Sequence, residues 1–209
     1  MKFLVFDCET TGLIPKYTDD INDYPHIVQL SWIVYDEEEN KIKEKDYIIK
    51  HSYIPEESSK IHRITTQISQ EKGEEMKYVL EQFIKDWNYC NMVIAHNLSF
   101  DMKMILAETQ RLNLHINTKS KIYYCTMKNS IDLCKIEIKN NRKKTFYKYP
   151  KLYETFKTLY TKETIDESKL HNSLADIYLC MICFYKMYYD HDIRNINNMF
   201  KLKYEKIFK

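Results

Sequence analysis

The sequence predicts an α/β domain built around a mixed β-sheet. Three strand-like segments occupy the first 51 residues, and helical and strand-like segments alternate after them, which is the order expected of such a sheet. At 209 residues, 44% of them hydrophobic, the chain suits one domain with a full core. Only two glycines and four prolines argue against disorder or a long linker.

The N-terminal strands are predicted from short apolar runs. Residues 2–7 form a short apolar run of the kind found in buried strands, and a turn at Gly12 follows it. Residues 26–35 form a second apolar run. An acidic turn at residues 36–40 connects this second run to residues 43–51. We expect residues 43–51 to pair with the second strand as a hairpin.

Helical periodicity dominates the remainder of the chain. Thr65 begins a helical region, and the apolar residues of 74–88 share one helix face. Short apolar runs at 92–95 and 121–126 are predicted strands. Further helices are predicted at about 100–112, after residue 126, at 150–161, at 173–189 and in a short C-terminal stretch.

Four acidic residues lie beside these apolar segments. Asp7 ends the first strand and Glu9 lies two positions further on the same extended segment, Asp101 follows the strand at 92–95, and Asp176 lies at the start of the late helix. Period-two alternation puts Asp7 and Glu9 on one face of the sheet. Each acid alone has a plainer interpretation as a solvated carboxylate or a helix cap, but four carboxylates brought together need a cation or a proton between them. An all-oxygen set suits Mg²⁺ or Mn²⁺ better than zinc.

His171 lies five positions before Asp176. A lone histidine at a helix start is more often a capping or packing residue. The acid at this offset favours a catalytic interpretation, because an imidazole with a pKa of ~6.5 can take a proton from water at neutral pH. We therefore predict that His171 is a general base beside the metal site.

Three motifs in order resemble the DEDD 3′→5′ exonucleases. They are Asp-x-Glu-Thr-Thr-Gly at 7–12, His-Asn-x-x-Phe-Asp at 96–101 and His-x-Ser-x-x-Asp at 171–176. The segments at 25–29, 54–57 and 61–65 also resemble the family. Asn172 stands where the tyrosine subclass has its tyrosine, so the resemblance favours the histidine (DEDDh) subclass. Arg63 and Ser173 depart from the usual glycine and alanine.

The resemblance implies a ribonuclease H-like fold, a five-stranded mixed β-sheet flanked by α-helices. It implies two Mg²⁺ ions, for which Mn²⁺ can substitute, held by Asp7, Glu9, Asp101 and Asp176. It also implies release of nucleoside 5′-monophosphates from nucleic-acid 3′ ends. We expect the exonuclease domain to cover 1–189, and residues 190–209 to be a helical extension packed on the same domain.

The resemblance also suggests substrate-binding residues. The backbone of Thr10, Thr11 and Gly12 is expected to cradle the 3′-terminal nucleotide, and Leu13 to wedge against its base. Phe100 has two open roles, stacking on a base and core packing. Asn97 is either a helix cap, which is slightly favoured, or a substrate contact. A substrate role for His62 is the less favoured alternative to a structural one.

The expected partner is nucleic acid with a free 3′ end, with single strands favoured. Residues 135–151 carry seven basic side chains interleaved with aromatic residues; a solvated loop is the plainer interpretation, and a patch that guides single strands is the sharper one. Two other functions are weighed: a non-catalytic nucleic-acid-binding or polymerase-docking module on the same fold, and an RNase H-type endonuclease. DNA or RNA preference, a homodimer and a polymerase partner stay open.

No segment approaches the roughly 20 apolar residues of a membrane span, and no signal peptide is recognised. We therefore expect no membrane partner and an intracellular location, cytoplasmic or nuclear. Cys180 and Cys183 have a C-x-x-C spacing, but they lie in an apolar helical pattern. Core packing is therefore favoured over a redox or zinc role.

Overall fold

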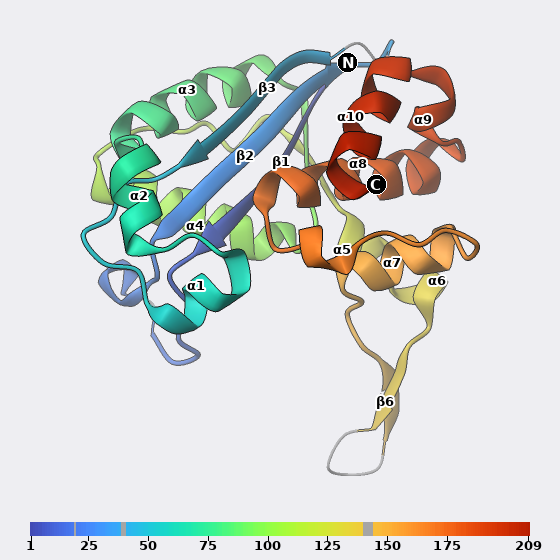
Figure 1. The fold of residues 1–209 in the computed structure, drawn as a ribbon, viewed down its shortest axis with the longest axis horizontal. Coiled ribbons are helices and arrows are strands. Elements are labelled where there is room, and N and C mark those ends of the chain that lie inside the picture. Colours follow the sequence, from blue (N-terminus) through green and yellow to red (C-terminus); the bar gives the residue numbers. More distant parts are fainter. Residues whose placement is uncertain (19, 39–40, 140–143) are drawn as a thin grey trace.

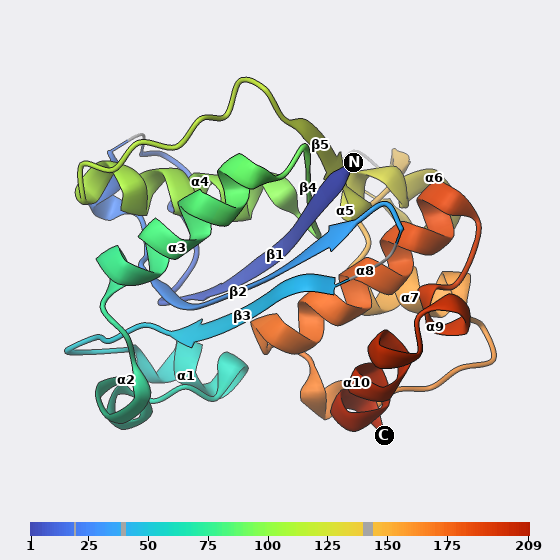
Figure 2. The same cartoon turned by 90° about the horizontal axis from the view of Figure 1, so that it is seen from above.

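A five-stranded mixed sheet forms the centre of the computed structural model, which describes residues 1–18, 20–38, 41–139 and 144–209. The strand order is β3-β2-β1-β4-β5. The strands are β1 (Lys2–Thr10), β2 (Ile27–Asp36), β3 (Lys41–Ile48), β4 (Met92–Ala95) and β5 (Ile122–Cys125). The first three pair antiparallel, whereas β4 is parallel to β1 and β5 is parallel to β4. This sheet, flanked by helices (Figures 1 and 2), confirms the predicted fold class.

Two helical layers cover the sheet, and alternation along β1 explains why. Helices α3 (Met76–Tyr89) and α4 (Leu98–Arg111) lie on one side and α8 (Ser173–Tyr189) on the other (Figure 2). Phe3 and Val5 pack in the core beside α8, whereas Leu4 and Phe6 pack in the core beside α3 and α4. Both faces of the central strand are therefore buried, as its continuous apolar run predicts.

Smaller helices connect and extend these layers. They are α1 (Glu56–His62), α2 (Thr66–Lys72), α5 (Thr126–Asn129), α6 (Ile131–Cys134), α7 (Leu152–Leu159), α9 (Ile193–Ile196) and α10 (Asn198–Phe208). Phe200, Tyr204 and Phe208 of α10 pack into the same core as α8. Cys180 and Cys183 are buried in that core, as their apolar surroundings predict. Within the described residues, no helix is both long and apolar enough to cross a lipid bilayer.

A two-stranded hairpin, β6 (Glu137–Lys139) and β7 (Thr145–Tyr147), extends away from the body of the molecule (Figure 1). It occupies the basic segment for which a solvated loop was the plainer interpretation. Arg142 and Lys143, two of the seven basic residues in that segment, lie outside the described residues.

Two strand boundaries and one helix differ from the sequence prediction. The first strand continues to Thr10 because β2 pairs with it over its full length. The third strand covers Lys41–Ile48 instead of 43–51, since Ile49 leaves it to form a bridge with Glu74. Helix α1 was not predicted: it begins directly after Pro55 and buries only Ser58 and His62, so it has no apolar stripe.

Candidate active site

A cavity of about 560 Å³ opens at the C-terminal end of β1. The end of β1, the start of α4, the segment before α7 and the start of α8 form its wall. The lining residues are Asp7, Cys8, Glu9, Leu13, His96, Asn97, Phe100, Asp101, Met127, Tyr149, Pro150, Lys151, Leu152, His171 and Asp176. All four predicted acids and the predicted base therefore face one cavity.

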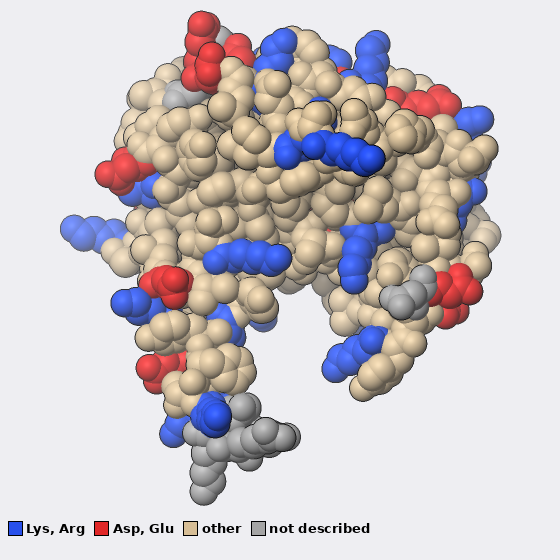
Figure 3. Space-filling model, turned by 180° about the vertical axis from the view of Figure 1, so that it is seen from behind, with Lys and Arg blue, Asp and Glu red and all other residues tan. Residues whose placement is uncertain are grey.

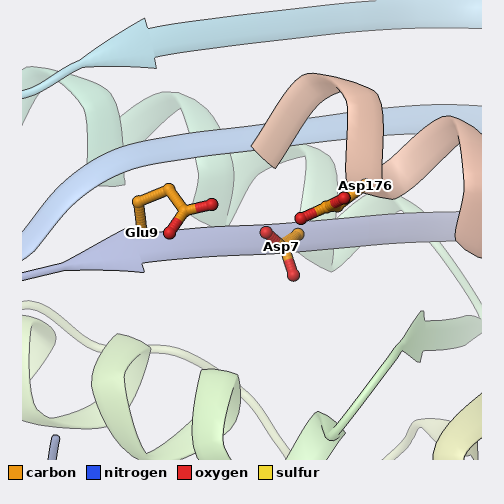
Figure 4. Close-up of side chains that lie close together, drawn as sticks. All are labelled: Asp7, Glu9 and Asp176. Atoms are coloured by element: carbon orange, nitrogen blue, oxygen red, sulfur yellow. The ribbon is translucent and has the colours of Figure 1, made fainter. Parts of the chain in front are cut away.

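Asp7, Glu9 and Asp176 bring carboxylate oxygens to within 4.8 Å of one another. Asp7 and Glu9 continue the odd-numbered face of β1, the face that packs under α8. Asp176 descends from the first turn of α8, so its carboxylate meets theirs from above the strand (Figure 4). Asp7 and Glu9 were predicted to share one sheet face, and Asp176 was predicted to lie at a helix start. These positions bring the three carboxylates together in one cluster.

Asp101 reaches the cavity from the opposite layer. It lies in the first turn of α4, is 3% exposed, and its Oδ1 accepts hydrogen bonds from the Cys8 backbone N–H at 3.3 Å and the Cys8 thiol at 3.2 Å. The N–H is available because the pairing of β4 with β1 covers only residues 3–5, which leaves the end of β1 unpaired on that side. Asp101 is not part of the close group of three oxygens.

Burial and mutual repulsion make this cluster unfavourable for negative charge. Desolvation, followed by repulsion from Asp101, Asp176 and Glu9, raises the pKa of Asp7 well above its usual range. Desolvation raises the pKa of Glu9 and that of Asp101 to about 7 each. It also raises the pKa of Asp176, with a further contribution from the charge of Glu9.

This electrostatic pattern fits a divalent cation. Asp176 Oδ1 is buried without a hydrogen-bond partner in the described structure, which is costly unless something neutralises it. The donors are all carboxylate oxygens, the ligands that hard cations such as Mg²⁺ and Mn²⁺ prefer. The residues present are therefore suited to hold such an ion, and Asp7, Glu9 and Asp176 have the spacing to do so.

His171 lies at the mouth of the cavity, two residues before α8. Its backbone has a left-handed φ of 60°, and its N–H donates to the Asp176 carboxylate. The side chain is exposed. Partial burial, followed by the positive charges of Lys151 and Arg63, lowers the pKa of His171, so its imidazole is neutral and can accept a proton. The next residue, Asn172, caps α8 through the Ala175 N–H at 3.3 Å.

The predicted substrate residues divide into two groups. Leu13, which is 85% exposed, and the half-buried Phe100 line the cavity. Asn97 also lines it. This residue is the N-cap of α4, with a φ of 68°, as the capping alternative predicts, but its side chain makes no capping hydrogen bond. Thr10 and Thr11 are not among the lining side chains, and neither is Gly12, whose carbonyl accepts from Thr10 Oγ1 at 2.7 Å.

His62 lies behind this segment, away from the cavity wall. It is 4% exposed, and its Nδ1 accepts the Ile64 backbone N–H at 3.1 Å, which places the ring proton on Nε2, facing the Thr10 backbone. Ser58, also on α1, donates to the Thr11 carbonyl at 2.7 Å. Helix α1 thus supports the backbone that follows Glu9 and brings no His62 atom to the cavity surface.

Several residues that line the cavity were not predicted from the sequence to belong to the site. Cys8 and Met127 look like ordinary apolar residues in the sequence, and Leu152 belongs to an amphipathic helix. His96 connects two parts of the wall through hydrogen bonds with Thr126 Oγ1 at 2.9 Å and the Pro150 carbonyl at 3.0 Å. Tyr149 and Lys151 did carry a signal, because they end the basic and aromatic run at 135–151.

Comparison with solved structures shows the same fold. E. coli exonuclease I in complex with a dT13 oligonucleotide superposes with a TM-score of 0.65 at 16% identity, over 95% of this chain and 43% of that chain. The zinc-bound form of the E. coli exonuclease I complex with single-stranded DNA gives 0.64 at 18%, over 90% and 41%. Exonuclease I from Methylocaldum szegediense gives 0.65 at 14%, over 93% and 42%. The chain thus spans about two fifths of the length of these structures.

A search of curated protein sequences gives no match. The sequence profile of the exonuclease family, of the ribonuclease T type, matches residues 4–184, which is most of the chain. Together with the mixed five-stranded sheet and the four acids at one cavity, this match confirms the resemblance seen in the sequence. The chain belongs to the exonuclease family.

Proposed function

We propose that this protein hydrolyses the 3′-terminal phosphodiester of single-stranded nucleic acid and releases nucleoside 5′-monophosphates. The observation that carries the proposal is the convergence of Asp7, Glu9 and Asp176 within 4.8 Å, beside His171, in an open cavity.

The four acids are the proposed metal ligands. Asp7, Glu9 and Asp176 would hold one ion, and Asp101 would complete the site with Asp7. Two Mg²⁺ ions, for which Mn²⁺ can substitute, would stabilise the attacking and leaving oxygens of an in-line displacement. The raised pKa values of these acids support this role, because ion binding relieves the repulsion and desolvation that raise them.

His171 is the proposed general base. Its neutral imidazole would take a proton from the attacking water, and the lowered pKa favours the neutral form at pH 7. The hydrogen bond from its backbone N–H to Asp176 couples the loop that carries the base to a metal ligand. This coupling supports a fixed distance between the base and the reacting phosphate.

The remaining lining residues suit a nucleotide. Leu13 and Phe100 offer apolar surface for the terminal base, and Asn97 offers an amide for hydrogen bonding. E. coli exonuclease I has been seen with dT13 and with dA16 oligonucleotides, which supports a single strand as the substrate here. The six free cysteines fit a reducing compartment and so support an intracellular site of action.

The test is a 5′-labelled single strand incubated with Mg²⁺. We expect a ladder shortened from the 3′ end, and no ladder from Asp7→Asn. A strand with a blocked 3′ end and a circular strand are the controls, and both should persist. Cleavage of the circle would indicate an endonuclease, whereas binding without cleavage of any strand would indicate the non-catalytic module; either result would reject the proposal.

A further inference from the structure

The hairpin of β6 and β7 carries side chains that no core explains. All six strand residues are exposed, and the apolar ones are prominent: Ile138 is 38% exposed, Phe146 47% and Tyr147 40%. A two-stranded ribbon covered on neither face buries little apolar surface, so these side chains contribute little to folding. Contiguous exposed aromatic and apolar residues of this kind mark a binding surface.

The same segment concentrates positive charge. Among its described residues, 135–139 and 144–151, there are five lysines and one glutamate, although the whole chain has a net charge of only +2. Lys148 is engaged with Glu154 at 2.6 Å. Lys139 and Lys151 are exposed. The described part of this segment is therefore positively charged, and it suits an anionic partner better than a cationic or neutral one.

The hairpin leads directly into the cavity. Residues 149–151 follow β7 and line the cavity wall, and Tyr149 is itself 58% exposed. The Lys148 N–H donates to the Ile136 carbonyl at 2.9 Å, so the strand pairing continues one residue beyond β7. Tyr147 and Tyr149 are two residues apart on this extended segment. They therefore point to the same side, about 7 Å from each other.

Lys139 shares that side. In the antiparallel register Lys139 is opposite Thr145 and Glu137 is opposite Tyr147, and directly opposed residues project to the same face of the ribbon. Ile138 and Phe146 form the other face. One face of the hairpin thus carries an exposed lysine and two tyrosines in a line that ends at the cavity.

The surface around the cavity has a matching shape. In Figure 3 the hairpin projects from one side of the molecule, with a hollow between it and the segment that follows β1. Leu13, from that segment, and Tyr149, from the hairpin side, both line the cavity. A chain whose 3′ end occupies the cavity can leave it through this hollow, along the hairpin.

We propose that this face of the hairpin, defined by Lys139, Tyr147 and Tyr149, binds single-stranded nucleic acid upstream of the nucleotide being removed. Bases stack on the two tyrosines, and the Lys139 ammonium contacts a phosphate. The inference rests on the proposed function, which puts the 3′ end in the cavity and therefore the 5′ portion of the strand along the hairpin. The residues outside the description, 140–143, have no part in it.

The test compares long and short strands. The catalytically impaired Asp7→Asn protein is titrated with 5′-fluorescein oligo-dT of 4 and of 20 nucleotides, with and without the double substitution Lys139→Ala and Tyr147→Ala. We expect the Kd of the 20-mer to rise at least tenfold and that of the 4-mer to stay within twofold. The slope of log Kd against log salt for the 20-mer should fall by about 0.7, for one lost phosphate contact.

Two further variants serve as controls for the binding measurements. Tyr78→Ala with Lys85→Ala removes an exposed tyrosine and an exposed lysine from α3, on the far side of the body (Figure 1), and should leave both Kd values unchanged. Tyr147→Phe keeps the ring and should retain 20-mer binding. Melting curves should be unchanged for the hairpin variants, because the hairpin contributes little to the core.

The outcomes separate this inference from the proposed function. An unchanged 20-mer Kd in the double variant, or an equal loss for the 4-mer, would overturn the hairpin proposal. Trimming of the 4-mer by the unsubstituted protein in Mg²⁺ is measured separately and tests the proposed function. If the 4-mer and the 20-mer both persist in Mg²⁺ while the length-dependent binding holds, the function fails and the hairpin surface stands.

Discussion

Replacing Glu9 by glutamine should stabilise the metal-free protein while abolishing its activity. Desolvation raises the pKa of Glu9 from its ordinary value near 4.5 to about 7. Because the folded-state pKa lies above the unfolded-state value, the folded protein binds this proton more tightly. The associated stability is therefore present at low pH and is lost as the pH rises from about 4.5 to about 7.

The magnitude follows from the same values. One pKa unit is worth about 1.4 kcal/mol, so the difference between 4.5 and about 7 corresponds to about 3 kcal/mol lost by the time the pH reaches 8.5. Glutamine keeps the shape and removes the charge, but its buried amide retains part of the desolvation cost. We therefore expect Glu9→Gln to gain about 1–3 kcal/mol in EDTA at pH 8.5, which is about 3–10 °C in Tm for a chain of this size.

The assay is thermal unfolding by circular dichroism in EDTA at pH 5 and pH 8.5. At pH 5 the folded protein carries Glu9 largely protonated, so the gain should shrink below about 1 kcal/mol. Glu81→Gln, an exposed glutamate on α3, is the matched control and should be neutral at both values. Equal gains at both pH values, or a loss at pH 8.5, would refute the electrostatic reasoning.

Three other predictions test separate parts of the molecule. His171→Gln should lower kcat by about 10²–10⁴-fold with little change in KM, and should remove the acidic limb of the kcat–pH profile, which its lowered pKa puts below the usual histidine range. Arg194→Ala should cost about 3 kcal/mol in urea unfolding, because the guanidinium bonds Glu163 at 2.6 and 2.7 Å and Asp192 while lying over the Tyr204 ring. Ser58→Ala should cost about 1 kcal/mol and raise KM more than it lowers kcat, since its hydroxyl supports the backbone after Glu9.

Matched controls make these predictions specific. Lys186→Ala, which breaks an exposed pair with Asp190, should cost at most about 0.5 kcal/mol, in contrast to Arg194→Ala. Substituting Ser168, an exposed serine before α8, should leave KM unchanged, in contrast to Ser58→Ala. A His171→Gln enzyme that keeps the acidic limb, or an Arg194→Ala protein with unaltered urea stability, would contradict the respective argument.

The positions of Asp7, Glu9 and Asp176 were predictable because each follows from a local periodicity. Two-residue alternation puts Asp7 and Glu9 on the same face of the sheet. The apolar helix that begins at Ser173 places Asp176 in its first turn. The contact of Asp101 with Cys8 was not predictable, because it depends on β4 pairing with only the first part of β1. Register between distant strands is a property of tertiary packing that no local pattern encodes.

The hairpin and α1 were missed for a different reason. Each strand of the hairpin has three residues, all exposed, so neither shows the apolar alternation that identifies a half-buried strand. Helix α1 buries only a serine and a histidine, so it has no apolar stripe either. Neither element belongs to the main core. The periodicity of apolar residues in a sequence reveals elements that bury an apolar face. It does not reveal α1 or the hairpin, because neither buries such a face.

Packing of the core offsets the repulsion and desolvation of the carboxylates in the candidate active site. Each residue of α8 from Ile177 to Tyr185 is buried, and both faces of β1 are packed up to Phe6. This burial holds Asp176 above Asp7 even though repulsion and desolvation oppose the approach of the two carboxylates. The packing of α8 against β1 therefore supplies the energy that keeps these carboxylates close together.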